Sequence, residues 1–244
     1  MKRNLMMLVV AVLLTTTLVA KSNNEETITM GTNAYFPPFE SIGGASGDEI
    51  VGFDVEIAKA IAQKAGLKLE IKDLEFDTLL TALNAEKVDF VIAGMTITEK
   101  RAKSVNFSTP YYEATQAVIV QTSNNDIVTK DDIKNKKIAV QLGTTGNGVA
   151  DDFSKSVTAF NTGFEAIMEL KNGKVDLIII DEQPALAFLK KNSDLKIVEM
   201  KFEPEFYGIA VKKGNLDTLE IINATLQELK SSGKYDELMS EFMK

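Results

Sequence analysis

The hydrophobic pattern from residue 27 onward alternates between helical and strand-like spacing. Apolar residues over 52–65 recur at the spacing of one helix face, which predicts an amphipathic helix that ends at Gly66. Apolar residues at 67, 69 and 71 alternate with polar ones and predict a strand. A helix over 79–83 and an apolar strand over 88–93 follow. This order predicts crossover connections and a largely parallel sheet.

The same kind of pattern begins again at Lys137. The predicted strands lie at 138–140, 157–160 and 175–180, with a short helix after the first strand and another helix over 164–170. The segment Lys87–Ile92 recurs in closely similar form as Lys174–Ile179. This favours an internal repeat over a chance likeness between two buried strands. We therefore predict two α/β units in tandem.

Beyond the second unit, a strand over 208–211 and a helix over 216–229 are predicted, and we expect them to pack on the first unit. Two units joined by more than one chain crossing form a cleft, and α/β sheets bind ligands at the carboxyl ends of their strands. The candidate segments are Ala93–Thr96 and Asp181–Gln183. This architecture favours capture of a small molecule by hinge closure.

Residues 1–20 read as a secretory signal peptide. Lys2 and Arg3 precede an apolar run over 5–14, and Ala20 offers a small residue before a polar start. The run is short for a membrane span, so we favour a cleaved signal over an anchor. Position 21 is Lys and not the Cys that a lipoprotein needs. We expect a periplasmic or other extracytoplasmic location without covalent lipid anchoring.

The composition excludes several classes of catalytic and metal-binding site. The 244 residues include 27 Lys and Arg against 35 Asp and Glu, a net charge of −8, with no His and no Cys. This excludes disulfides, Ser-His-Asp and Cys-His catalytic sets, and His/Cys zinc sites. The acidic balance argues against nucleic-acid binding. We expect no metal and no cofactor.

Two segments offer groups for an anion. Arg101 lies shortly after Thr96, and a guanidinium with nearby hydroxyl and backbone N–H groups suits a carboxylate. The alternative is that Arg101 is a solvated surface charge. The loop 141–148, which includes Thr144 and Thr145, has no nucleotide-binding motif but can direct N–H groups at an anion, unless it is a plain turn.

Asp181 follows an apolar strand and suits an α-ammonium group, although it could equally cap a helix that begins near Pro184. Phe36 and Phe76 each follow a strand and are candidates to enclose a ligand side chain, with core packing as the alternative. Together, a cation, an anion-binding turn and an isolated carboxylate describe a receptor for a zwitterion. An amino acid is the simplest such ligand.

The chain resembles the extracellular polar-amino-acid-binding proteins of ABC importers from about Thr27 to Phe242. The resemblance rests on ordered motifs: Gly31–Asn33, Pro38–Phe39, Gly52–Asp54, Phe76–Asp77, Lys87–Asp89, Thr96–Arg101, Phe107–Ser108, Gly143–Thr144, Asp181–Glu182 and Gly233–Asp236. It implies an α/β, two-lobed type II periplasmic binding fold, in which each lobe is a mainly parallel sheet flanked by helices and the lobes are joined by a two-stranded hinge. It also implies a monomer that delivers a free amino acid to a membrane permease.

The resemblance assigns roles to individual residues. It implies that Arg101 holds the α-carboxylate with help from Gly94, Thr96 and Thr145, and that Asp181 holds the α-ammonium. The full predicted ligand-binding set is Asn33, Phe36, Phe76, Ala93, Gly94, Thr96, Arg101, Gln141, Thr144, Thr145 and Asp181.

The resemblance further implies a discontinuous first lobe of residues 27–115 plus 204–244, and a second lobe of residues 116–203. The chain is then expected to cross between the lobes near 113–117 and again near 201–206.

Selectivity follows less directly. Relatives that prefer cationic amino acids often carry an acid where this chain has Asn33, yet two phenyl faces suit a guanidinium. Asn33 and Gln141 also suit a glutamine amide. We expect glutamine, arginine or lysine as ligand and consider acidic amino acids less suitable. The alternative is an enzyme on the same fold, similar to cyclohexadienyl dehydratase, with Glu113 or Glu182 as the acid.

Overall fold

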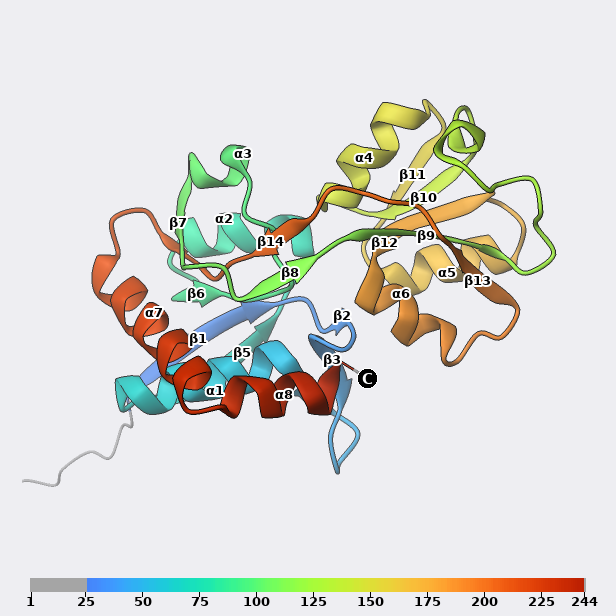
Figure 1. The fold of residues 1–244 in the computed structure, drawn as a ribbon. Coiled ribbons are helices and arrows are strands. Elements are labelled where there is room, and N and C mark those ends of the chain that lie inside the picture. Colours follow the sequence, from blue (N-terminus) through green and yellow to red (C-terminus); the bar gives the residue numbers. More distant parts are fainter. Residues whose placement is uncertain (1–25, 244) are drawn as a thin grey trace, which may run out of the picture.

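Two five-stranded sheets organise the computed structural model, which describes residues 26–243 (Figure 1). Each sheet carries helices and forms one lobe, as predicted. The predicted signal peptide, residues 1–20, lies outside the described residues. Within the described residues, no helix has both the length and the apolar character that crossing a membrane requires.

The sheet of the first lobe has the strand order β5-β1-β6-β15-β7. Its strands are β1 (Thr27–Thr32), β5 (Lys68–Asp73), β6 (Phe90–Val91), β7 (Val105–Phe107) and β15 (Ala210–Lys212). Its helices are α1 (Phe53–Ala65), α2 (Leu79–Asn84), α3 (Glu99–Ala102), α7 (Leu216–Ser231) and α8 (Lys234–Phe242), with a 3₁₀ turn at Phe76–Thr78. β1 is parallel to β5 and β6, whereas β15 is antiparallel to β6 and β7. The C-terminal segment therefore packs on the first unit, as expected.

The sheet of the second lobe has the order β11-β10-β12-β9-β13. Its strands are β9 (Gln116–Gln121), β10 (Ile138–Gln141), β11 (Val157–Phe160), β12 (Leu177–Asp181) and β13 (Leu195–Val198). Its helices are α4 (Thr145–Phe153), α5 (Gly163–Lys171) and α6 (Glu182–Leu189), with a 3₁₀ turn at Lys130–Ile133. β10 is parallel to β11 and β12, and β9 is antiparallel to its neighbours β12 and β13.

Two antiparallel strands, β8 (Tyr112–Ala114) and β14 (Glu205–Tyr207), run between the lobes (Figure 1). They lie within or beside the two segments where crossings are expected. A separate three-stranded sheet of β2 (Tyr35–Phe36), β3 (Glu40–Gly43) and β4 (Glu49–Val51) extends from the first lobe.

The sequence repeat occupies matching places in the two sheets. β6 and β12 are each third in strand order, parallel to the second strand and antiparallel to the fourth. The repeated aspartates make the same contact: Asp89 accepts the backbone N–H of Thr29 at 2.7 Å, and Asp176 accepts that of Lys137 at 2.8 Å. The assigned β6 is shorter than the predicted strand over 88–93, although backbone hydrogen bonds to β1 continue on both sides of it, from Asp89 to Thr29 and from Ile92 to Gly31.

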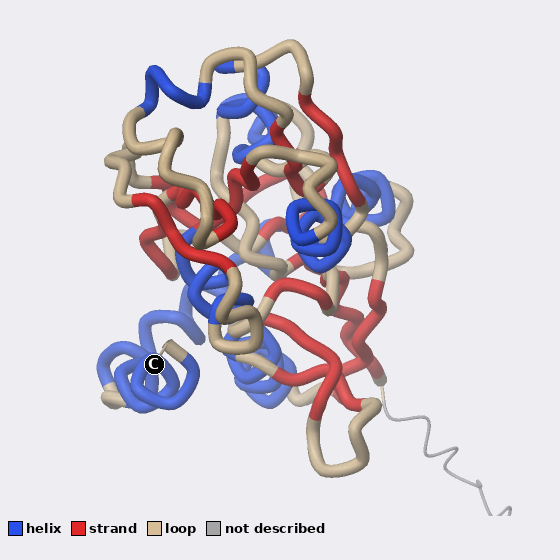
Figure 2. Tube along the Cα trace, turned by 90° about the vertical axis from the view of Figure 1, so that its right-hand side faces the viewer, coloured by secondary structure: helices blue, strands red, loops and turns tan. Residues whose placement is uncertain are grey.

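Helix α1 illustrates how the pattern becomes structure. Its apolar stripe is fully buried, including Phe53, Ile57 and Ile61, and each such side chain contributes roughly 1.5–3 kcal/mol of transfer free energy. Gly66 ends the helix in the left-handed conformation, with φ of 71°. Helices α7 and α8 both pack against α1, so the C-terminal end of the chain covers the first lobe (Figures 1 and 2).

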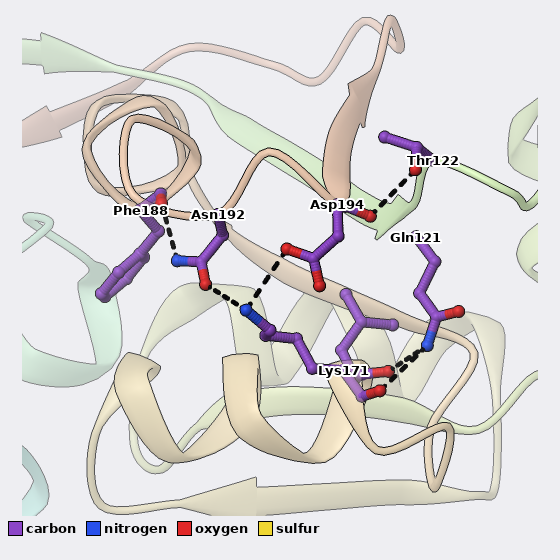
Figure 3. Close-up of polar contacts among 7 residues, drawn as sticks. Gln121, Thr122, Lys171, Phe188, Asn192 and Asp194 are labelled. Atoms are coloured by element: carbon purple, nitrogen blue, oxygen red, sulfur yellow. Dashed lines mark hydrogen bonds and ion pairs between the residues drawn. The ribbon is translucent and has the colours of Figure 1, made fainter.

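Polar contacts fasten the outer corner of the second lobe (Figure 3). The Lys171 ammonium, at the end of α5, donates to the side chain of Asn192 at 2.7 Å and pairs with Asp194 at 3.2 Å. Asn192 donates to the carbonyl of Phe188 in α6 at 2.8 Å. These contacts join α5, α6 and the start of β13.

Candidate ligand-binding site

One pocket between the lobes gathers most of the predicted site. It is lined by Phe36, Phe76, Gly94, Thr96, Arg101, Gln141, Thr144, Thr145, Ile180 and Asp181. Every predicted residue except Asn33 and Ala93 is therefore on its wall, and Ile180 is an addition. The first lobe supplies the residues up to 101 and the second lobe the others, so the pocket exists only where the lobes meet.

The side chain of Arg101 is held by two backbone carbonyls and lies near the ring of Phe76. Its Nη1 donates to the carbonyl of Thr96 at 2.6 Å, and its Nη2 donates to the carbonyl of Gly143, in the other lobe, at 3.0 Å. The guanidinium carbon lies 5.3 Å from the centre of the Phe76 ring. A guanidinium has five N–H groups, so several remain for an anion in the pocket. Arg101 is half-buried and both of its terminal nitrogens are engaged, which disfavours the alternative of a solvated surface charge.

The charge on Arg101 has opposing influences. Burial lowers the pKa of its guanidinium, whereas the carboxylates of Asp181 and Glu205 raise it. Arginine stays protonated at any physiological pH, so the pocket holds a permanent cation on one wall.

Asp181 is the last residue of β12 and the N-cap position of α6, but its side chain makes no capping hydrogen bond. Its Oδ1 instead accepts from the Nε2 of Gln116 at 2.5 Å, and its Oδ2 accepts from the hydroxyl of Tyr207. Burial raises the pKa of Asp181 to about 7, with a further contribution from the charge of Glu205. The carboxylate is therefore directed at the site and not at the helix.

The two threonines of the loop after β10 make different contacts. The hydroxyl of Thr144 donates to the carbonyl of Gln141 at 2.8 Å and accepts the N–H of Asn147, so it caps α4. The hydroxyl of Thr145, the next residue, donates to Glu205 at 2.6 Å. The first turn of α4 thus reaches the pocket while its own start is capped.

Gly94 allows the backbone to pass close to the Phe36 ring. Its φ of 53° is left-handed, and an added Cβ would lie 2.7 Å from the Phe36 ring. Its N–H donates at 2.8 Å to the buried carboxylate of Asp54, which also accepts the hydroxyl of Tyr111. The resemblance implies that Gly94 helps to hold the α-carboxylate. Because its N–H is already engaged, that donor is not available to a ligand.

The two phenyl rings serve both packing and the pocket. Phe36 is 6% exposed and stacks on Phe39 at 6.0 Å between ring centres, and Phe76 is 8% exposed. Both rings also line the pocket. The two interpretations of these rings are therefore compatible.

Asn33 and Gln141 meet across the cleft. The Nε2 of Gln141 donates to the Oδ1 of Asn33 at 2.9 Å, and the Nδ2 of Asn33 donates to the carbonyl of Leu74. The Oε1 of Gln141 is buried and accepts no hydrogen bond. Because Gln141 lines the pocket, this oxygen offers an unused acceptor to a ligand that carries N–H groups.

Sequence reasoning missed three polar side chains of this region: Gln116, Glu205 and Tyr207. Gln116 begins β9, and the other two lie on β14. The sequence places Glu205 in the crossing expected near 201–206 and Tyr207 just beyond it, and residues two apart project from the same side of an extended strand. It does not indicate which groups these side chains contact.

Glu113 and Glu182, the acids of the enzyme hypothesis, lie elsewhere. They line a neighbouring hollow beside the hinge strands with Tyr112 and Phe202, and neither lines the pocket between the lobes, although Asp181 lines both. Within residues 26–243, no group of three or more potential ligands among His, Cys, Asp and Glu is arranged to hold a metal ion.

A two-lobed α/β fold with a cation and a carboxylate facing one interlobe pocket defines a solute-binding protein. The chain belongs to the bacterial extracellular solute-binding proteins, family 3, whose model matches residues 28–244. It is 35% identical to the ABC transporter arginine-binding protein 1 of Escherichia coli (strain K12) over 224 residues, which is 89% of this chain and 90% of that protein.

The chain is also similar to solved structures of amino-acid-binding proteins. An ancestral arginine-binding protein bound to arginine has 46% identity and a TM-score of 0.83, over 89% of this chain and 98% of that one. One bound to glutamine has 44% identity and a TM-score of 0.83, over 88% and 97%. An ancestral amino-acid-binding protein described as a precursor of cyclohexadienyl dehydratase has 34% identity and a TM-score of 0.83, over 89% and 96%.

Proposed function

We propose that this protein is the extracytoplasmic solute-binding component of an amino-acid ABC importer. It captures an L-amino acid between its lobes and delivers it to the permease. The observation that carries the proposal is the opposed pair of Arg101 and Asp181 at one interlobe pocket. A zwitterion satisfies both charges at once, whereas a simple cation or anion leaves one of them unpaired and partly desolvated.

Binding and closure are linked in this proposal. Residues 27–115 with 204–244 move against residues 116–203 about β8 and β14. The hydrogen bonds from Arg101 to Gly143 and from Gln141 to Asn33 join the lobes in the closed form. Since these contacts surround the ligand, it stabilises the closed form by the difference between its affinities for the two forms.

The side-chain end of the pocket favours L-arginine. The unused Oε1 of Gln141 accepts N–H groups, and the phenyl faces of Phe36 and Phe76 suit a guanidinium. Glutamine carries N–H donors of the same kind and is the second choice. A glutamate or aspartate side chain would meet this oxygen with another acceptor and is disfavoured.

Thermal unfolding of residues 21–244 with each candidate amino acid tests the proposal. A ligand at 100 times its Kd adds about 2.7 kcal/mol to the free energy of unfolding, which raises Tm by several degrees. We expect this rise with arginine and a smaller one with glutamine or lysine. No rise with any common amino acid, or turnover of prephenate or arogenate, would contradict the proposal.

A further inference from the structure

Glu205 joins both lobes from the hinge. Its Oε2 accepts the hydroxyl of Thr96, from the first lobe, at 2.8 Å and the hydroxyl of Thr145, from the second, at 2.6 Å. Its Oε1 accepts from the Nε2 of Gln116 at 3.3 Å, and the same nitrogen donates to Asp181. A side chain of β14 is therefore bonded to two residues of the pocket wall, although it does not line the pocket itself.

The number of available hydrogens decides which group is the donor in each of these hydrogen bonds. An ionised carboxylate only accepts, so both threonines must donate to it, and each hydroxyl has a single hydrogen. Both hydroxyl groups are therefore already committed to Glu205. What Thr96 and Thr145 present to the pocket is oxygen lone pairs, so their side chains act there as acceptors.

We propose that Glu205 is a positioning residue that sets the polarity of the α-ammonium corner of the site. By taking both hydroxyl hydrogens, it makes the side chains of Thr96 and Thr145 acceptors for an ammonium group and prevents these hydroxyls from donating to a carboxylate or a neutral hydroxyl. The resemblance implies that these two residues help to hold the α-carboxylate, and under this proposal only their backbone N–H groups do so. This inference rests on the proposed function, because it concerns how the same pocket recognises an amino acid.

The surrounding groups agree with this division. The Nε2 of Gln116 has two hydrogens and lies within hydrogen-bond distance of three acceptors: Asp181 at 2.5 Å, Glu205 at 3.3 Å and the hydroxyl oxygen of Thr145 at 3.4 Å. It therefore brings these acceptors together around one donor group. Arg101 has N–H groups left for the α-carboxylate after its two bonds to backbone carbonyls. Acceptors therefore gather around Asp181 and spare donors around Arg101.

The test compares ligands that differ only at the α-substituent. L-Arginine and L-glutamine are each titrated by calorimetry beside their α-hydroxy acid analogues, which keep the carboxylate and the side chain. Wild type, Glu205→Gln and Glu205→Leu are measured. Glu203→Gln, an exposed residue close along the chain, serves as the matched control. The readout is the ratio of the Kd of the hydroxy acid to the Kd of the amino acid.

We expect the ratio to fall at least tenfold in both Glu205 variants and to stay at the wild-type value in Glu203→Gln. In a Thr145→Val background, which lacks one of the two hydroxyls, the effect of Glu205→Gln is expected to shrink because Glu205 acts through that group. This background also tests the inference if a Glu205 single variant folds poorly.

Two failures are distinguishable. If wild type binds an amino acid and the ratio is unchanged in the Glu205 variants, even where both affinities fall together, the positioning role is overturned and the proposed function stands. If wild type binds none of the common amino acids, both proposals are overturned.

Discussion

Two residues of opposite charge, Arg101 and Asp181, line the pocket between the lobes. Arg101 is held against Phe76 and two backbone carbonyls, while Asp181 is held by Gln116 and Tyr207. Both side chains are fixed by contacts other than the ligand, so their ordering cost falls on folding and not on binding. Because both side chains are preorganised, a substitution or a change of protonation at either one should change ligand affinity directly.

Arg101→Ala should weaken amino-acid binding by at least roughly 100-fold, because removing one partner of a desolvated ion pair costs about 2–5 kcal/mol. Calorimetric titration measures the change, and circular dichroism checks that the variant folds. Lys103→Ala removes the same charge from an exposed position nearby and should bind as wild type does. An unchanged Kd in Arg101→Ala would remove this residue from the site.

The pKa of Asp181, about 7, predicts that binding depends on pH. Below pH 7 a proton competes with the ligand ammonium for the carboxylate, so affinity should fall by up to about tenfold per pH unit on acidification and level off above pH 7. Titrations from pH 5 to 8.5 measure it. Asp181→Asn should bind weakly with a flat profile over this range, and a flat wild-type profile would contradict the assignment.

A site residue could be predicted from sequence where it follows closely on a predicted strand. Arg101 and Asp181 each follow a strand whose end the hydrophobic pattern locates, so they could be assigned before the fold was known. Glu205 could not, because its partners Thr96 and Thr145 are brought to it only by the packing of two lobes around β14. The engaged N–H of Gly94 likewise depends on the distant Asp54.

At the scale of elements, the turn between β10 and α4 governs how closely the lobes approach. Gly143 has a left-handed φ of 78°, and a Cβ added there would lie 2.8 Å from the Cβ of Asp77 in the other lobe. The glycine therefore serves both the turn and the closed interface. Its carbonyl is also the one that Arg101 bonds across the cleft.

Gly143→Ala should weaken ligand binding about tenfold or more, because the added methyl opposes closure and lowers the population of the binding-competent form. Gly214→Ala is the matched control, since its φ of 86° carries the same backbone strain but an added Cβ meets nothing within 4 Å. Both should lose roughly 1–2 kcal/mol of stability. Equal affinity in the two variants would contradict a role for Gly143 in closure.

The repeat was predictable at this scale because it is local in sequence. Asp89 and Asp176 open equivalent strands and bond equivalent neighbours, which explains why the Lys-Val-Asp start recurs. The fourth strand of each sheet was predictable in one lobe only. The first lobe takes β15 from the C-terminal segment, as the predicted strand over 208–211 indicated, whereas the second lobe takes β9 from the chain just after the first crossing, where the hydrophobic pattern had predicted no strand.

For the whole molecule, stability is coupled to pH through a buried acid pair in the first lobe. Glu40 and Asp54 are fully buried, and both oxygens of Glu40 and the Oδ1 of Asp54 have no donor. Burial raises the pKa of Asp54 to about 6, and burial together with Asp54 raises that of Glu40 further above its ordinary value. The pair is therefore most stable when it holds a proton.

Unfolding of the ligand-free protein should show this coupling. The folded pKa of Asp54 lies above its unfolded value, so its contribution is fully present below about pH 4 and is lost as pH rises through 6; Asp181 acts in the same sense through 7. Tm should therefore fall from pH 5 to 8. Glu40→Gln, whose amide can donate to Asp54, should flatten the profile and keep Tm at pH 8 at or above wild type. A wild-type Tm that rises over this range would contradict the assignment.

The most direct test of zwitterion capture is a calorimetric titration of residues 21–244 with L-arginine and with agmatine, which lacks only the carboxylate. Zwitterion capture predicts saturable binding of one arginine per chain and agmatine binding weaker by roughly 100-fold or more, because Arg101 then has no anion to pair with. Equal affinities for the two compounds, or no binding of any common amino acid, would contradict it.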